Sequence, residues 1–162
     1  MIDIIQISKK VLAGLSAMNY EKDGGSSFKQ LIFPMKIQAK GTNPINRISE
    51  QELRLLFIEE FKIANSYLFY SIETPTQEKY KFGKTYADIE VNKDGRSASL
   101  DMYIFERISN VYNRILNIEF KYRNAVIKNI GKDVLKLMKE KQNGAFILLL
   151  DNTNRGTFCN NK

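Results

Sequence analysis

The sequence predicts an α/β fold in which a central mixed sheet is flanked by helices. Two segments near the middle of the chain, residues 99–105 and 115–122, have the apolar and aromatic content of β-strands. A helical segment at residues 126–142 then leads into the apolar run at 145–150, which is typical of a buried strand paired in parallel through a helical crossover. The expected core order is therefore helix, three strands, helix and strand.

One domain is expected, because 162 residues suffice for a core and no linker or repeat divides them. Residues 1–48 would form an extension with a helix and a strand, residues 49–151 the core, and residues 152–162 a polar tail. No apolar run approaches the roughly 20 residues that cross a bilayer. Charged residues also interrupt the apolar amino terminus, so the expected location is cytoplasmic.

The composition excludes several kinds of chemistry. The chain has no histidine, which removes histidine-activated nucleophiles, histidine-containing zinc sites and histidine general bases. Cys159 is the single cysteine, so an intrachain disulfide is impossible. Catalysis would therefore depend on carboxylates, lysines, tyrosines or metal-bound water. The formal charge of +7 favours a polyanionic partner, although solubility alone would also explain it.

The amino-terminal segments carry one helical and one strand pattern. Apolar residues recur at spacings of three and four through residues 2–18, which predicts a packing helix; they are Ile4, Ile7, Val11, Leu15 and Met18. Residues 28–40 alternate in the manner of a strand, and Pro34 favours an edge position.

Ser49 and Glu52 form a capping-box pattern that predicts the start of the next helix. At 100° per residue its apolar arc contains Leu53, Leu56, Phe57, Phe61, Ile63 and Ala64. Glu60 falls inside this arc, whereas Glu59 lies off it. A carboxylate in an apolar face needs a cation, or becomes neutral, or reaches water at the helix border. Glu60 is therefore either a structural ion-pair partner or a metal-facing acid.

The middle of the chain predicts further strands. Residues 67–73 read as a strand that ends at Thr74-Pro75-Thr76, and the polar residues 77–85 read as a surface loop. Residues 86–91 and 97–105 flank Asn92-Lys93-Asp94-Gly95, in which the Asp-Gly pair predicts a hairpin turn.

Three charged residues can meet on the two central strands. Side chains alternate along a strand, so Glu119 and Lys121 share one face, and pairing of the two strands would bring Asp101 close to Glu119. Two carboxylates suit Mg²⁺ or Mn²⁺, which keep coordination positions for water and phosphate. The alternative to a metal site is an ordinary solvent-exposed strand face on which charged residues alternate.

The helix expected at residues 126–142 has two distinct faces. Its buried stripe would contain Ile127, Ile130, Val134, Leu137 and Met138, while lysines recur on another face at Lys128, Lys132, Lys136 and Lys139.

In this arrangement residues 49–151 resemble the PD-(D/E)XK nuclease superfamily, which has the restriction-endonuclease-like fold. Carried over residue by residue, Glu60 would be the helix acid, Asp101 the strand aspartate, and Glu119-Phe120-Lys121 the acid-x-lysine tripeptide. Leu100 stands where the family's signature proline would be, and Glu59 could replace Glu60.

The resemblance implies a Mg²⁺-dependent or Mn²⁺-dependent endonuclease whose expected substrate is DNA, with RNA as the alternative, and which works as a homodimer if it cuts both strands. Asp101, Glu119, the Phe120 carbonyl and Glu60 would hold the metal, and Lys121 would orient the attacking water. Backbone phosphates would meet a group of cations, namely Arg123, Lys128, Lys132 and Lys136, unless these form only a solvated helix face. The competing hypotheses are a catalytically inactive nuclease-like module for nucleic-acid binding or assembly, and an unrelated α/β domain.

Overall fold

The computed structural model describes residues 2–17, 31, 35–36, 45–46, 48–84, 88–123 and 127–150. The chain divides into two compact units, Met1–Ser66 and Tyr67–Lys162, which are considered separately below. The tail at residues 152–162, with Cys159, lies outside the described residues, as does most of the expected edge strand at 28–40.

The amino-terminal unit is built on two helices that pack on each other, α1 (Ile4–Ser16) and α2 (Glu50–Ala64). The Asp3 side chain caps α1 by accepting a hydrogen bond from the Gln6 backbone N–H at 2.9 Å. Ile7, Val11 and Leu15 are buried and Ile4 is half-buried, which confirms this part of the predicted stripe, whereas Met18 lies outside the described residues. Two short antiparallel strands, β1 (Met35–Lys36) and β2 (Ile45–Asn46), complete the described part of this unit.

The α2 helix begins as predicted. Ser49 is the N-cap, and both halves of its capping box with Glu52 are formed. Leu53, Leu56, Phe57 and Phe61 are buried, but Ile63 is 68% exposed and Ala64 is also exposed. The expected burial of the last two was wrong, because they belong to the final turn of the helix, which ends at the Asn65 C-cap.

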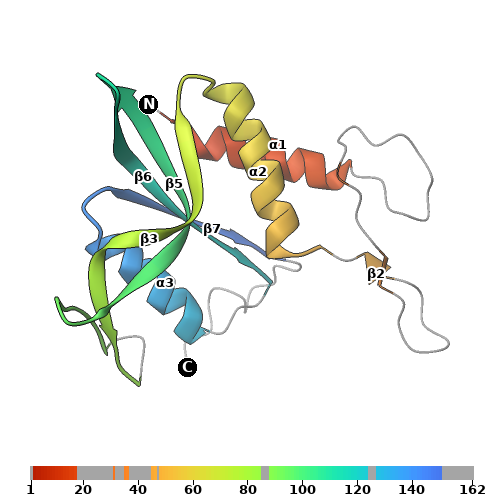
Figure 1. Cartoon of the computed structure of the whole chain (residues 1–162). Coiled ribbons are helices and arrows are strands. Elements are labelled where there is room, and N and C mark those ends of the chain that lie inside the picture. Colours follow the sequence, from red (N-terminus) through yellow and green to blue (C-terminus); the bar gives the residue numbers. More distant parts are fainter. Residues whose placement is uncertain are drawn as a thin grey trace. The chain divides into compact units, whose positions relative to one another are not determined.

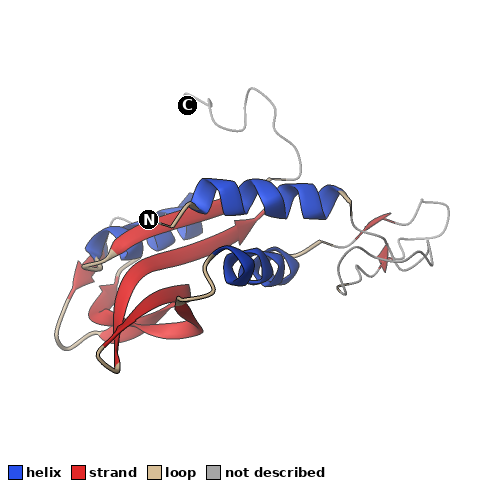
Figure 2. Ribbon diagram, turned by 90° about the horizontal axis from the view of Figure 1, so that it is seen from above, coloured by secondary structure: helices blue, strands red, loops and turns tan. Residues whose placement is uncertain are grey.

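The second unit contains a twisted five-stranded sheet (Figures 1 and 2). Its strands, in spatial order, are β4 (Ile89–Val91), β3 (Phe69–Phe82), β5 (Arg96–Ile108), β6 (Val111–Tyr122) and β7 (Asn143–Leu149). All neighbouring pairs are antiparallel except β6 and β7, which are parallel and joined by α3 (Ile127–Lys139). The predicted α/β class, the mixed sheet and the helical crossover are therefore confirmed.

The β3 strand is much longer than the sequence predicted. Residues 77–82 continue the strand instead of forming a loop, after a register shift between Pro75 and Lys79. Two side chains, Thr76 of β3 itself and Glu140 beyond α3, bind backbone groups around this shift. The Thr76 hydroxyl accepts from the Ala98 N–H at 3.0 Å, and the Glu140 carboxylate accepts from the Gln77 and Glu78 N–H groups at 3.0 and 3.2 Å.

The hairpin predicted between residues 86–91 and 97–105 does not form. The turn itself exists, with the Gly95 N–H donating to the Asn92 carbonyl at 2.9 Å, but β3 lies between β4 and β5. The turn crosses β3 so closely that a Cβ on Gly95 would lie 2.5 Å from the Tyr80 carbonyl. The Asp-Gly pair therefore lies in a tight turn that passes close to β3 and connects β4 to β5, which do not pair with each other.

Apolar residues of the two central strands are fully buried, among them Met102, Ile104, Ile118 and Phe120. Leu100 and Tyr103 form a cluster with Leu137 of α3, so the helix packs on one face of the sheet. Met138 is 73% exposed, and its expected burial was wrong because the α3 face toward the sheet runs through Lys136 and Leu137 instead. None of the described helices is long and apolar enough to span a bilayer, and the cytoplasmic location stays a prediction.

Candidate metal and nucleic-acid site

The β5–β6 pair brings two of the predicted acids together. Met102 pairs with Ile118, so extending this antiparallel register by one position sets Asp101 opposite Glu119. The Asp101 carboxylate accepts a hydrogen bond from the Phe120 backbone N–H at 2.7 Å, which ties it to β6. Asp101 also contributes to the electrostatic environment of Glu119, whose pKa its negative charge raises.

A lysine of α3 enters this site from above the sheet. Lys136 Nζ lies 2.5 Å from Glu119 Oε1, 3.0 Å from the Ser99 carbonyl oxygen and 2.9 Å from Asp133 Oδ1. Lys136 is 8% exposed and Glu119 is 2% exposed, so this contact is shielded from solvent. Lys136 was expected to meet backbone phosphates, but its ammonium faces the sheet.

Asp133 joins the second lysine to the same group. Its Oδ2 lies 3.1 Å from Lys121 Nζ, while its Oδ1 contacts Lys136. We call Asp101, Glu119, Lys121, Asp133 and Lys136 the acid–lysine cluster. Three carboxylates face two ammonium groups, so the cluster carries a net charge of −1 when all five are ionised.

The excess of carboxylates over ammonium groups affects the pKa values of Glu119 and Lys136. Burial raises the pKa of Glu119 to about 8; Lys136 opposes the rise, whereas Asp133 and Asp101 add to it. Burial disfavours the charged form of Lys136, but the Glu119 and Asp133 carboxylates outweigh it and leave the Lys136 pKa raised. The cluster thus favours an additional positive charge, which a proton on Glu119 or a bound cation would supply.

The other expected metal-site residues are Glu60, with its alternative Glu59, and Phe120. Glu60 and Glu59 are both half-buried on α2, which belongs to the amino-terminal unit. Phe120 is fully buried between the two members of the Glu-x-Lys pattern.

The expected phosphate-binding residues have separate surroundings. Arg123 is exposed, with its guanidinium 5.2 Å from the Tyr122 ring centre. Lys132 is half-buried, with Nζ 5.7 Å from the Phe82 ring centre. The side chain of Lys128 lies outside the described residues.

Sequence reasoning missed Asp133 and the inward direction of Lys136. One signal was available, since Asp133 is the only acidic residue between Ile127 and Lys139 and lies three positions before Lys136. Residues three apart share a helix face. The recurring lysines suggested a solvated stripe, which hid this pair.

A second buried carboxylate fixes the far end of α3. Glu140 accepts hydrogen bonds from the Gln77 and Glu78 N–H groups and from the Tyr80 hydroxyl, the last at 2.6 Å. Burial, and then the Glu140 carboxylate, raises the pKa of Tyr80 above its ordinary value. These contacts attach the end of the helix to the β3 irregularity and so help to position Asp133 and Lys136 within the cluster.

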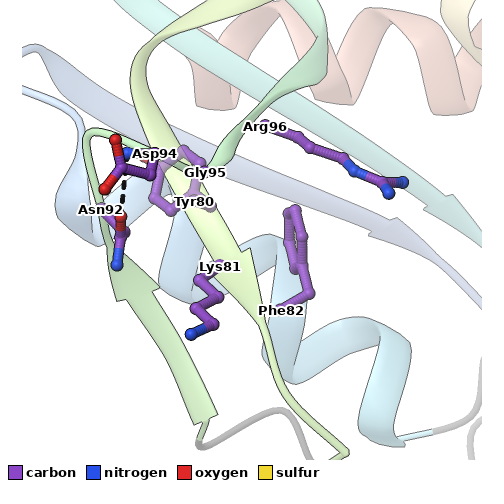
Figure 3. A pocket seen from close by; sticks show the side chains of 7 residues that line it. All are labelled: Tyr80, Lys81, Phe82, Asn92, Asp94, Gly95 and Arg96. Atoms are coloured by element: carbon purple, nitrogen blue, oxygen red, sulfur yellow. Dashed lines mark hydrogen bonds between the residues drawn. The ribbon is translucent and has the colours of Figure 1, made fainter.

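A cationic cavity of about 510 Å³ opens beside β3 (Figure 3). It is lined by Tyr80, Lys81, Phe82, Asn92, Asp94, Gly95 and Arg96. Figure 3 shows Phe82 and Arg96 on one side of β3 and Lys81 on the other, as strand alternation requires. Phe82 is 40% exposed, and Lys132 of α3 lies over its ring, so this helix contacts one residue of the cavity lining as well as the acid–lysine cluster.

The chain has no match among protein-family models, curated proteins or solved structures. The residues themselves therefore carry the functional argument. Within the described part of the chain, no three acidic or cysteine side chains gather in the spacing of a metal cage. Mg²⁺ does not require one, since it binds through one or two carboxylates and keeps several waters. Asp101 and Glu119 are carboxylates, a donor type that Mg²⁺ uses, and Lys136 lies beside Glu119.

Proposed function

We propose that this chain is a metal-dependent nuclease with a restriction-endonuclease-like core that hydrolyses DNA phosphodiester bonds. The observation that carries the proposal is the meeting of Asp101 from β5 with Glu119 and Lys121 from β6 in one buried acid–lysine cluster. The succession α2, β3, β5, β6, α3, β7 supports it, with the short β4 inserted between β3 and β5 and a parallel last strand reached through a helical crossover. The role that the resemblance implies for Glu60 stays a prediction.

In this function each group of the site would have a separate role. Asp101, Glu119 and the Phe120 carbonyl would hold Mg²⁺, which supplies Lewis-acid activation of the phosphate and of a bound water. Lys121 would place its ammonium beside the phosphate and offset charge that develops there. Asp133, which contacts Lys121 at 3.1 Å, would keep that ammonium directed into the site.

The charge of the cluster supports cation binding. Its three carboxylates outnumber its two ammonium groups, and the Glu119 pKa is raised to about 8 because burial and the neighbouring acids disfavour another negative charge there. A divalent cation would relieve this excess more strongly than a proton does. Buried carboxylates of this kind are common at functional sites.

The cationic cavity supports a nucleic-acid substrate. Lys81 and Arg96 line it, and the exposed Phe82 ring offers a surface on which a base can stack. Lys132 lies beside that ring, at the helix that also carries Asp133. A formal charge of +7 for the whole chain agrees with electrostatic attraction of a polyanion.

The test is Mg²⁺-dependent cleavage of supercoiled plasmid DNA by the full chain. Wild-type protein should nick or linearise the plasmid, and chelation of the metal should stop it. Asp101→Asn and Lys121→Met should each lose at least about 100-fold in rate, because both remove groups that act at the reacting phosphate. Glu106→Gln, at an exposed position of β5, is the matched control and should cleave normally. Undiminished cleavage by Asp101→Asn would refute the proposal.

A second candidate is a nuclease-like module that binds nucleic acid without cutting it. The 2.5 Å contact between Lys136 and Glu119 favours it, because an internal ammonium already neutralises one of the two proposed metal ligands. In that case calorimetry would detect no Mn²⁺ binding, while DNA binding would persist and weaken steeply with salt.

A further inference from the structure

We propose that Lys136 is an internal cation that competes with the metal ion for Glu119, so that metal loading requires this lysine to leave its oxygen cage. The inference rests on the proposed function, because it assigns a regulatory role at the same site. The proposed metal site gives Lys136 no role, although its ammonium contacts the Ser99 carbonyl, Glu119 and Asp133.

The contacts of Lys136 resemble those of a bound cation. Its ammonium has three N–H donors and three oxygen acceptors, the Ser99 carbonyl at 3.0 Å, Glu119 Oε1 at 2.5 Å and Asp133 Oδ1 at 2.9 Å. These acceptors come from β5, β6 and α3. One backbone carbonyl and two carboxylates are also the donor types that hard divalent cations select.

Charge repulsion makes the two cations compete for Glu119. Lys136 Nζ lies 2.5 Å from Glu119 Oε1, so an ammonium group already neutralises this carboxylate. An ammonium within a few ångströms of a dication is also repelled in a site this poorly solvated.

Asp133 gives the displaced lysine another partner. It lies three residues before Lys136 on α3 and already contacts its ammonium. Lys136 can therefore release Glu119 and Ser99 while keeping this ion pair. The exchange would couple metal loading to the contact between α3 and the β5–β6 strands.

The first test is calorimetric titration of the full chain with Mn²⁺. Lys136→Gln removes the charge but keeps a hydrogen-bond donor, and Lys139→Gln makes the same charge change at an exposed position of the same helix. Lys136→Gln should bind Mn²⁺ at least about tenfold more tightly than wild type, because a nearby positive charge is gone. Lys139→Gln should bind like wild type. A merely structural role for Lys136 would leave the affinity unchanged or lower it.

The outcomes separate this inference from the proposed function. Equal Mn²⁺ affinity in wild type and Lys136→Gln overturns the inference and leaves the nuclease proposal standing. Absence of binding in all three proteins overturns both. Binding by Lys136→Gln alone supports the inference in its strongest form, in which the lysine has taken the place of the metal, and it favours the non-cutting module.

A second measurement uses only wild-type protein and so does not depend on a variant that folds. Acetylation of lysine amines is followed residue by residue by mass spectrometry, with and without Mn²⁺. Lys136 should react slowly without metal, because its amine is caged, and several-fold faster with it. Lys139 should react at one rate throughout. Bound Mn²⁺ that leaves the Lys136 rate unchanged would overturn the inference.

Discussion

Lys136 of α3 and Glu119 of β6 form a buried ion pair, with Nζ 2.5 Å from Oε1. The glutamate of the Glu-x-Lys pattern is thus paired with a lysine that is 17 residues away, while Lys121 of the pattern contacts Asp133. Two lysines and three acids share one charge network as a result. This arrangement determines how the charges of the site depend on pH.

The stability of the protein should depend on pH through Glu119. Its folded pKa of about 8 lies above the ordinary value of 4.5, so the folded state retains a proton that the unfolded state loses. The stabilisation is complete below the unfolded pKa and is lost as pH rises toward the folded one. Wild-type protein should therefore lose more unfolding free energy than Glu119→Gln between pH 5 and pH 8, in metal-free urea titrations. Parallel pH profiles of the two proteins would contradict this assignment.

Glu140 should be the most important polar residue outside the cluster for stability. Glu140→Ala leaves the Gln77 and Glu78 N–H groups and the Tyr80 hydroxyl without their acceptor, which should cost about 2–4 kcal/mol of unfolding free energy. Glu106→Ala, at an exposed position of β5, should change it by less than about 0.5 kcal/mol. Equal urea midpoints for the two variants would show that Glu140 does not anchor α3.

Two glycine substitutions should have opposite effects. Gly95→Ala places a Cβ 2.5 Å from the Tyr80 backbone carbonyl, so the turn must move away from β3 at a cost of about 1–3 kcal/mol. Gly14→Ala in α1 meets nothing within 4 Å and should stabilise the helix by about 0.5–1 kcal/mol. Thermal unfolding of both variants measures the contrast. A neutral Gly95→Ala would mean that the crossing has room to relax.

The cationic cavity should contribute to DNA affinity without base specificity. Replacing both Lys81 and Arg96 by glutamine should weaken binding of a short duplex and lower the slope of log affinity against log salt by about 1–2. Lys9→Gln combined with Lys10→Gln, on exposed positions of α1, makes the same charge change elsewhere. Fluorescence anisotropy at several salt concentrations distinguishes the two double variants. Identical slopes would remove the cavity from the binding surface.

Local patterns allowed several elements to be predicted from the sequence. The Ser49 capping box, the α1 stripe and the alternation that puts Glu119 and Lys121 on one face depend only on neighbouring residues. The parallel β7 followed from an apolar run after a helix, because such a strand needs a crossover. These features are the ones in which local chemistry and the final structure agree.

Other features were inaccessible because distant groups create them. The polar residues 77–82 form a strand since Glu140 and Thr76 satisfy backbone groups at the β3 irregularity, and Glu140 is more than 60 residues away. The Asn92–Gly95 turn has the composition of a hairpin turn, yet β3 occupies the position between β4 and β5. The local sequence around a turn does not show which strand of the sheet will pair with the strands that the turn connects.

The sequence by itself determined the types of chemistry that are possible, through its lack of histidine and its strand-borne Asp101, Glu119 and Lys121. Only the tertiary structure decided which charges meet. Packing of α3 on the sheet brings Lys136 and Asp133 to Glu119. Because Lys136 and Glu119 are buried, the distances between these charged groups control their interaction energies. The physical reason is that electrostatic interactions depend on distance and solvent exclusion in three dimensions, which helix and strand periodicity do not specify.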